Sequence, residues 1–430
     1  MFVGWRKYGQ SAKKLAKTGP SIQNKPHVIV VCELYHREGA HVTFNAGMIE
    51  VIRLAFPEEK IVFFGEAAHV EQVQKQAGAA ISSSICWKTI VPPPREANYF
   101  GRLASAIKAI KRLANYLGQR SDNRLVFTSI SPSTLIALKL MGRLALKDMP
   151  IQVVSHGEIK SGVIGKRHRH PWRRFKEMRT AVTLFGRSSI QYLVLEHGIQ
   201  ERILQSLPSL AGKIEVLEHP LPPNETTFGM KRMSSPVHFG FLGLANEMKG
   251  FSTFLHLAAE ISRKHPGKAE FHAIGRLEPG ADSRREMEFL ATKPGLERLS
   301  RHEYIERVKR LHFIIMPYRL DYYELSPSGT LLDAIAWGIP IIANRLPIFE
   351  RTFRTYGDVG YLFSNEKELH AIVEDLVEGM DESGYAHQVA NLGEARLSRT
   401  PEKLAAVYRE ICSRGVHLDV NFNSEVAANG

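Results

Sequence analysis

The strongest constraint on the fold is an alternation of short apolar runs with helical segments that repeats along most of the chain. Runs such as "HVIVVCEL" (residues 27–34), "KIVFFGE" (60–66) and "HFGFLGL" (238–244) are short, nearly all apolar and rich in β-branched or aromatic residues. Apolar runs without a polar face are typical of strands that helices cover on both sides. The pattern therefore predicts an α/β chain with doubly wound parallel sheets.

A proline-rich segment divides this alternation into two cycles. "KIEVLEHPLPPNE" (213–225) carries three prolines, so it is a candidate hinge, and 430 residues suffice for two domains with cores of their own. We expect a cleft between two Rossmann-like domains, because ligands of such sheets bind beyond the carboxyl ends of the strands. The expected parts are a basic N-terminal arm at 1–26, a first domain at 27–213, a second domain at 214–400, and a C-terminal helix and tail at 401–430.

The formal net charge of +13 points to an anionic partner, and the charge is concentrated in two basic clusters of the first half. Residues 98–120 carry five basic side chains and no acid, with apolar positions at helical spacing; residues 165–179 surround Trp172 and Phe175 with basic side chains. No recognised RNA- or DNA-binding motif is present, and the aromatic residues do not alternate with basic ones as in a base-stacking surface. We therefore expect no nucleic-acid partner.

The chain carries no sign of export or of a membrane span. No apolar run approaches the roughly 18 residues that a spanning helix needs, and the N-terminus lacks the apolar core of a secretory signal. Cys32, Cys86 and Cys412 stand far apart, without the spacing of a metal site or a disulfide framework. We expect a cytoplasmic protein with reduced thiols, no bound metal and no cofactor.

Small hydroxyl residues and a glycine stand directly before one strongly helical segment. Ser326, Ser328 and Gly329 precede its first turn, where free backbone N–H groups and the helix dipole favour a phosphate group. Asp333, one turn further in, is an acceptor that could hold a ribose hydroxyl pair. The same residues also fit an ordinary helix N-cap and a solvated acid, so this segment alone leaves both readings open.

The residues that follow resemble a known donor-site signature. "LLDAIAWGIPIIA" (331–343) is similar to the later half of the motif of retaining family-4 glycosyltransferases of GT-B architecture, and Asp333 falls at the acid that binds the donor ribose. The first acid of that motif is replaced by Leu325, with Glu324 one residue earlier. Either Glu324 takes that role, or the loop is of the serine-glycine type in which backbone and hydroxyl groups contact the donor. We favour the second interpretation.

Two further segments carry the same resemblance, which covers residues 237–363 well and the first half loosely. In "FGFLGLANEMKG" (239–250), Gly243 falls at the family's turn glycine and Lys249 at the lysine that grips the donor diphosphate. Leu244 stands where the family has an arginine, and Arg276 is expected to supply part of the missing charge.

In the first half, His156 ends a predicted strand and resembles the family's histidine beside the reacting sugar, and Gly39, with His41 nearby, resembles its glycine loop near the donor phosphates. The resemblance implies that His156 and Asp333 are catalytic. The implied donor-binding residues are Gly39, Gly243, Lys249, Arg276, Ser326, Ser328, Gly329, Thr330 and Asp333.

The resemblance implies a glycosyltransferase of the hexosyltransferase class, of GT-B fold, with two Rossmann-like domains facing across a cleft. It would move a sugar from a nucleotide-diphosphate sugar to an acceptor hydroxyl, with retention and without an obligatory metal, in bacterial polysaccharide or glycolipid assembly. A sugar-nucleotide epimerase of the same fold and a catalytically silent GT-B scaffold remain as alternatives. The sugar, the base, the acceptor, the anomeric outcome and the oligomeric state stay open.

The basic clusters suggest where the acceptor lies. In a GT-B protein the first half holds the acceptor, so a lipid-linked or glycan acceptor at an anionic membrane would account for their position, with the protein attached peripherally to the inner face of the cell membrane. We expect the helix at 99–117 to lie in the interface with Leu103, Ile107 and Ile110 toward the lipid. The alternative is that these residues pack on the sheet.

Overall fold

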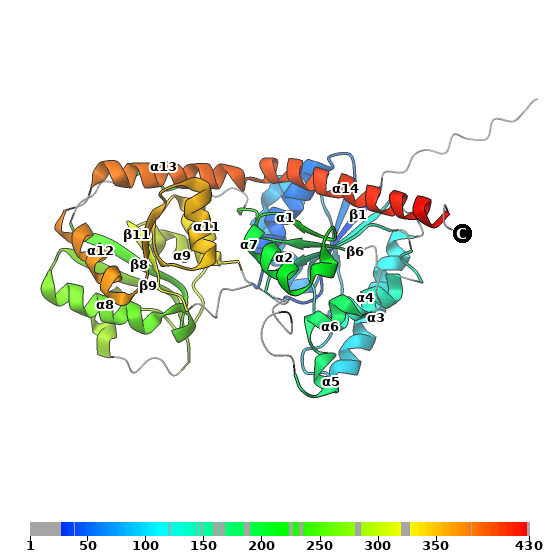
Figure 1. The fold of residues 1–430 in the computed structure, drawn as a ribbon, viewed down its shortest axis with the longest axis horizontal. Coiled ribbons are helices and arrows are strands. Elements are labelled where there is room, and N and C mark those ends of the chain that lie inside the picture. Colours follow the sequence, from blue (N-terminus) through cyan, green and yellow to red (C-terminus); the bar gives the residue numbers. More distant parts are fainter. Residues whose placement is uncertain are drawn as a thin grey trace, which may run out of the picture.

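The computed structural model contains two α/β domains side by side (Figure 1), each built on one parallel sheet. The described residues are 27–37, 39–118, 120, 122–142, 144–147, 149–157, 163, 168–184, 190–222, 227–231, 235–279, 285–319, 327–379 and 381–427. The N-terminal arm, Glu158, Glu324, Leu325 and Ser326 lie outside them. Among the described helices, none has both the length and the apolar character that crossing a bilayer requires.

The first sheet has the strand order β3-β2-β1-β4-β5-β6-β7, and every described pair is parallel. Its strands are β1 (Val28–Glu33), β2 (Lys60–Gly65), β3 (Cys86–Thr89), β4 (Arg124–Ser129), β5 (Ile151–Ser155), β6 (Ile190–Val194) and β7 (Ile214–Val216). Its helices are α1 (Val42–Ala55), α2 (Ala67–Ser82), α3 (Tyr99–Leu117), α4 (Pro132–Gly142), α5 (Pro171–Arg174), α6 (Met178–Thr183) and α7 (His197–Ser206).

The second sheet has the order β10-β9-β8-β11-β12-β13, again with parallel pairs. Its strands are β8 (Val237–Ala245), β9 (Ala269–Leu277), β10 (Leu290–Thr292), β11 (Phe313–Met316), β12 (Ile341–Asn344) and β13 (Gly360–Phe363). The helices of this domain are α8 (Phe251–Lys264), α9 (Arg301–Val308), α10 (Gly329–Trp337), α11 (Pro347–Tyr356), α12 (Glu366–Glu378) and α13 (Glu382–Ser398), and α14 (Pro401–Ala427) follows them in the chain. The doubly wound parallel architecture expected from the sequence is confirmed in both halves.

One strand lies in a different sheet from the one we expected. Residues 214–216 were expected to begin the second domain, but they form β7, which pairs with β6 at the edge of the first sheet. This strand stands directly before the prolines, and three residues are too few to carry a clear apolar pattern. The first crossing between the domains therefore comes after β7.

Helices cover both faces of each sheet because alternate strand residues point to opposite sides. In β1, Val30 and Cys32 pack with α3, α4 and α7, whereas Ile29 and Val31 pack with α1 and α2. In the second sheet, Phe239 packs with α8 and α12. Burial on both faces explains why the strands read as continuous apolar runs.

The C-terminal helices connect the two domains (Figure 1). Helix α13 packs on the second sheet, and α14 continues along the same side of the molecule to pack on the first domain. Leu404 and Tyr408 are buried in the core beside α1, and the Tyr408 hydroxyl donates a hydrogen bond to Oε1 of Gln152 on β5. The C-terminal helix is thus part of the first domain's core.

Helix α3 lies against α4 and the first sheet, which corrects our expectation for its apolar residues. Ile110 is completely buried, and Leu103 and Ile107 are half-buried against the same core. These three residues cannot also contact lipid. The exposed residues of α3 include the basic Lys108, Lys111 and Arg112, together with Phe100, Ala104, Asn115 and Tyr116.

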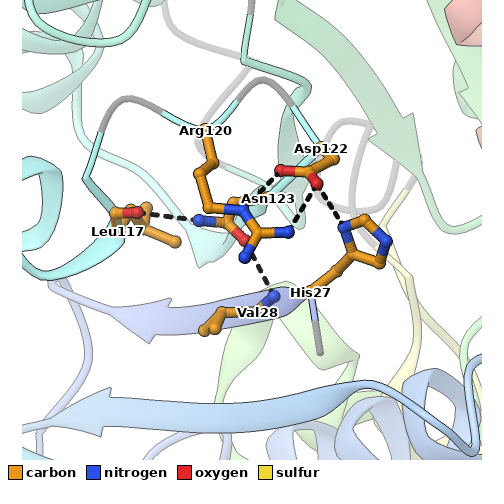
Figure 2. Close-up of polar contacts among 6 residues, drawn as sticks. All are labelled: His27, Val28, Leu117, Arg120, Asp122 and Asn123. Carbon is orange, nitrogen blue, oxygen red and sulfur yellow. Dashed lines mark hydrogen bonds and ion pairs between the residues drawn. The ribbon is translucent and has the colours of Figure 1, made fainter. Parts of the chain in front are cut away.

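The amino ends of β1 and β4 are tied together by the loop that precedes β4 (Figure 2). Oδ1 of Asn123 accepts a hydrogen bond from the backbone N–H of Val28 at 2.8 Å, and its Nδ2 donates to the carbonyl oxygen of Leu117 at 2.7 Å. Asp122 lies 2.6 Å from Nδ1 of His27. These contacts fix the central strands at the end opposite to their carboxyl edge.

Candidate functional site

A pocket of about 650 Å³ lies between the two domains at the carboxyl ends of the central strands. The first domain contributes His41, Phe44 and His156 to its wall, and the second contributes Gly329 and Asp333. Its volume is in the range of small-molecule sites. The fold thus brings three of the predicted site residues, His156, Gly329 and Asp333, to one cavity.

The first turn of α10 faces this pocket. Ser328 is its N-cap: the side-chain oxygen accepts a hydrogen bond from the backbone N–H of Leu331 at 3.2 Å, and the residue is fully buried. A Cβ atom on Gly329 would have no neighbour within 4 Å, so the backbone here is open to a ligand. The N-cap role expected as an alternative for Ser328 is therefore real, and the adjacent backbone is what borders the cavity.

Lys249, Gly243 and Thr330 form a cluster that joins the end of β8 to α10. Nζ of Lys249 donates to the carbonyl oxygen of Leu242 and to Oγ1 of Thr330, both at 3.3 Å. Gly243 has a φ of 90°, and a Cβ atom there would lie 2.9 Å from the Lys249 ammonium. A side chain at position 243 would therefore be strained and would displace the lysine.

Lys249 is nearly buried, with 8% of its surface exposed. Burial lowers the pKa of its ammonium to about 8, and the negative charge of Asp333 offsets part of that effect. Lys249 lies behind the first turn of α10 and is not among the residues that line the described cavity. An ammonium held in this way acts on a ligand mainly through its charge.

Asp333 is held by two residues of α9. The Tyr304 hydroxyl donates to its Oδ2 at 2.9 Å, and Nη2 of Arg301 lies 3.5 Å from its Oδ1. The Arg301 guanidinium also lies 5.0 Å from the ring centre of Trp337 and lines the pocket. The sequence analysis missed Arg301 and Tyr304, because residues 301–308 show only an amphipathic helix and no motif.

The wall formed by the first domain is a cluster of histidines. His156, directly after β5, is 6% exposed, and its Nε2 lies 3.0 Å from the carbonyl oxygen of Thr128. The His156 ring lies 4.1 Å from that of His41 and 4.3 Å from that of Phe44, and the rings of His36 and His41 stack at 3.5 Å. Sequence reasoning singled out His156 and His41 but missed His36.

His156 and the half-buried His219, which also lines the pocket, stay neutral near pH 7. Burial, followed by the proximity of His219 and His36, holds the pKa of His156 well below its usual range. Burial also lowers the pKa of His219 to about 4, although its Nδ1 can donate to the carbonyl oxygen of Pro220 at 2.8 Å. Neutral imidazoles can both donate and accept hydrogen bonds, which suits contact with sugar hydroxyls.

A buried carboxylate fixes the loop after β1, which carries His36 and His41. Glu33, at the end of β1, accepts hydrogen bonds from the backbone N–H groups of Tyr35 and His36 at 2.8 and 2.9 Å. Its other contacts are the hydroxyls of Thr128 and Ser129 at the end of β4. Glu33 therefore sits where the strand order reverses, the usual ligand end of such a sheet, and orders its loop.

Two predicted residues lie away from the pocket. Arg276 is exposed at the end of β9, beside Leu244 in the strand register, and it does not line the cavity. Gly39 is also exposed and outside the lining; a Cβ atom there would lie 3.6 Å from Arg298 of the other domain. Ser326 lies outside the described residues.

The comparisons with known proteins identify the fold. No protein-family model matches the chain, and no curated protein matches it. A glycosyltransferase from Rickettsia africae ESF-5 superposes with a TM-score of 0.60 and 10% identity, covering 90% of this chain and 99% of that one. The E. coli trehalose-6-phosphate structure with bound UDP-2-fluoro glucose gives the same TM-score, identity and coverage.

A Listeria monocytogenes protein proposed to be a UDP-N-acetylglucosamine 2-epimerase superposes with a TM-score of 0.53 and 12% identity, covering 89% of this chain and 94% of that one. The chain therefore has the GT-B fold, as expected. At these identities the likeness concerns the fold alone, and it includes both a glycosyltransferase and the epimerase class.

Proposed function

We propose that this protein is a glycosyltransferase that moves a sugar from a nucleotide-diphosphate sugar to an acceptor hydroxyl with retention. The observation that carries the proposal is the pocket itself, in which the open first turn of α10 and Asp333 face His156 of the other domain. A donor spanning the cleft would place its diphosphate at α10 and its sugar toward the histidines.

The diphosphate is the part of the donor that needs positive charge. As the bond between the anomeric carbon and the phosphate oxygen breaks, that oxygen gains negative charge, and the proton of the acceptor hydroxyl can pass to it. The backbone at Gly329, the helix dipole and the buried Lys249 would stabilise this charge. Arg301 lines the pocket, so it replaces Arg276 as the proposed source of additional charge.

The remaining residues would position the donor. Asp333 is the proposed acceptor for the ribose hydroxyls, with Tyr304 and Arg301 fixing its carboxylate. His156, with Nε2–H donating to Thr128, keeps Nδ1 as an acceptor for a hydroxyl of the transferred sugar. The chemistry then depends on position and electrostatics more than on covalent help.

The proposed acceptor is carried by an anionic membrane. Lys108, Lys111 and Arg112 are exposed on α3, and Trp172 of α5 is 67% exposed. Figure 1 shows α3 and α5 on the same flank of the first domain. With the apolar residues of α3 packed inward, attachment would depend on basic side chains and on Trp172 at the headgroup level.

A donor screen tests the catalytic proposal. The full-length protein is mixed with UDP-, ADP- and GDP-sugars, and thermal unfolding is followed; a ligand at 100 times its Kd stabilises by about 2.7 kcal/mol. The stabilising donor is then incubated with the protein, and we expect slow release of nucleoside diphosphate and free sugar. Lys249→Ala is expected to reduce both effects.

The same experiment separates the alternatives. Formation of an isomeric nucleotide sugar without release of nucleoside diphosphate would identify an epimerase instead. If no nucleotide sugar stabilises the folded protein, the catalytically silent scaffold becomes the better interpretation. Among the described residues that line the pocket, Asp333 supplies the carboxylate, and it is already bonded to Tyr304, so the epimerase has less support.

A further inference from the structure

Three ligand-type side chains meet at the end of the second sheet that lies away from the pocket. His238 is near the start of β8, and Glu270 and His272 are near the start of β9. His238 pairs with Glu270 in the strand register, and Glu270 and His272 are two residues apart, so all three lie on one face of the sheet. The backbone of the two strands therefore sets their spacing.

The three potential ligand atoms form a compact triangle. Nδ1 of His238 lies 3.0 Å from Nε2 of His272, and Oε2 of Glu270 lies 3.4 Å and 3.6 Å from these two atoms. A tetrahedral zinc ion with bonds of about 2.0–2.1 Å holds its ligands roughly 3.3 Å apart. An ion could thus contact all three atoms with shifts of a few tenths of an ångström.

A neighbouring hydroxyl orients one of the imidazoles. Oγ1 of Thr292 on β10 lies 2.9 Å from Nδ1 of His272. With the proton on Nδ1 and donated to this hydroxyl, Nε2 of His272 presents its lone pair to the triangle, as in metal-binding histidines whose other ring nitrogen donates a hydrogen bond. In the absence of a metal, His238 and His272 can share one proton across their 3.0 Å contact.

The surroundings provide both a rigid wall and an opening. His272 is buried, whereas the side chains of His238 and Glu270 are 23% and 43% exposed, so an ion can enter from solvent. The His238 ring stacks on His312, whose Nδ1 accepts a hydrogen bond from the His238 backbone N–H at 2.9 Å. Lys231 and Arg310 also act on His238 electrostatically, which lowers the affinity for a cation.

We propose that His238, Glu270 and His272 bind a divalent zinc ion, with water completing the coordination. Two imidazoles and one carboxylate are a ligand set that suits borderline ions such as Zn²⁺ better than Mg²⁺ or Ca²⁺. Because Gly243 lies near the end of β8 and Lys249 follows that strand, an ion at the start of β8 would brace the strand that leads to the pocket without touching a ligand there. The inference does not depend on the proposed transfer reaction.

Calorimetry with ZnCl₂ tests the site on full-length, tag-free, chelator-treated protein. We expect saturable zinc binding, no comparable binding of Mg²⁺, and a higher thermal midpoint with zinc. Glu270→Gln keeps the shape of an exposed side chain and removes the anionic ligand, and we expect it to lose this binding event. His238→Asn is the second variant, and Thr292→Val should weaken binding roughly 10–100-fold, because the hydrogen bond that orients the His272 imidazole is lost.

A second histidine–glutamate pair of the same domain is the matched control. Nδ1 of His370 lies 2.8 Å from Oε2 of Glu260 on the surface, so His370→Gln removes a similar pair and should leave zinc binding unchanged. Circular dichroism verifies the fold of each variant. Equal zinc affinity and stoichiometry in the wild type, Glu270→Gln and His238→Asn would overturn the proposal and place any bound zinc elsewhere, for example at the histidines of the cleft.

Discussion

Nζ of Lys249 lies 3.3 Å from Oγ1 of Thr330, and this contact joins the carboxyl end of β8 to the first turn of α10. The two residues are 81 positions apart in sequence. A cation and an open helix N-terminus are thereby held together before any ligand arrives. Such preorganisation removes part of the cost of ordering charged groups around a diphosphate.

Replacing Lys249 tests this arrangement. We expect Lys249→Ala to weaken donor binding by roughly 1.5–3 kcal/mol, because the buried positive charge beside the first turn of α10 is lost. Calorimetry with the donor found in the screen measures the effect. Lys367→Ala, at an exposed position of α12, is the control and should change nothing. Equal donor affinity in both variants would remove Lys249 from the site.

Asp333 of α10 is compared with Glu324, which precedes α10 in the sequence. Asp333→Ala should impair donor use strongly, since it removes the proposed ribose acceptor and frees Tyr304 and Arg301 from their partner. Glu324→Ala should have the smaller effect, because Glu324 is out of register with the family motif by one residue. The rate of donor hydrolysis is measured for both variants. If Glu324→Ala were the more damaging change, the alignment of the motif would be off by one.

Two arginines can be compared as sources of charge for the diphosphate. Arg301 lines the pocket, whereas Arg276 is exposed outside it. Arg301→Ala should therefore reduce donor affinity several-fold more than Arg276→Ala, and Arg301→Lys should restore only part of it, because a lysine cannot keep the planar contact with Trp337. A larger loss of donor affinity in Arg276→Ala than in Arg301→Ala would indicate that Arg276 supplies the charge for the diphosphate.

Because the histidines of the pocket wall are neutral near pH 7, we expect the protein to lose stability in acid. The pKa of His219 is lowered from 6.5 to about 4. Between these values the unfolded chain binds a proton that the folded chain does not, so its contribution to stability is present above pH 6.5 and lost as the pH falls toward 4.

His219→Asn keeps a donor for the Pro220 carbonyl but does not titrate. Urea unfolding at pH 7 and pH 4.5 should show a fall in the free energy of unfolding that is smaller in this variant, by about 2 kcal/mol at most. The same fall in both proteins would mean that His219 titrates normally in the folded state.

Membrane attachment is tested by co-sedimentation with vesicles. The triple variant Lys108→Glu, Lys111→Glu, Arg112→Glu should lose binding to anionic vesicles while donor affinity stays the same, since α3 is remote from the pocket lining. Binding of the wild type should fall in high salt, because salt screens charges over about 10 Å at 0.1 M.

The matched control reverses Arg263, Lys264 and Lys268 of the second domain, which are also exposed. It carries the same change in net charge and should sediment like the wild type. If the wild type stays in the supernatant with anionic vesicles at low salt, a soluble acceptor becomes the better proposal.

The fold could be predicted because its signals are local. Burial on both faces leaves continuous apolar runs such as β1, and turn chemistry marks their ends. The docking of α14 on the first domain could not be predicted, since the buried contact of Tyr408 with Gln152 joins residues 256 positions apart and periodicity only says that a helix has an apolar face. For the same reason β7, only three residues long, was placed in the wrong half.

The residues of the candidate site show the same difference between local and long-range signals. Gly329 and Asp333 were predicted because they belong to one contiguous motif, and the pocket contains both. His219 and Arg301 line the pocket, and His36 and Tyr304 contact residues that do, only through tertiary structure, so no spacing in the sequence links them. Arg276 was predicted to bind the donor because it is a positive charge at the end of a strand. Only the three-dimensional structure shows that its side chain is exposed outside the pocket.

The chain crosses between the domains at two places, and these lie next to each other. The backbone N–H of Leu221, after β7, donates to the carbonyl oxygen of Arg399, between α13 and α14, at 3.2 Å. Two adjacent connections form a hinge: they allow the two domains to rotate about one axis and resist a twist of one domain relative to the other. We therefore expect the cleft to open and close by rotation about these two connections, with its two walls keeping the same faces toward each other. A cut at either crossing would still leave the domains joined by the other.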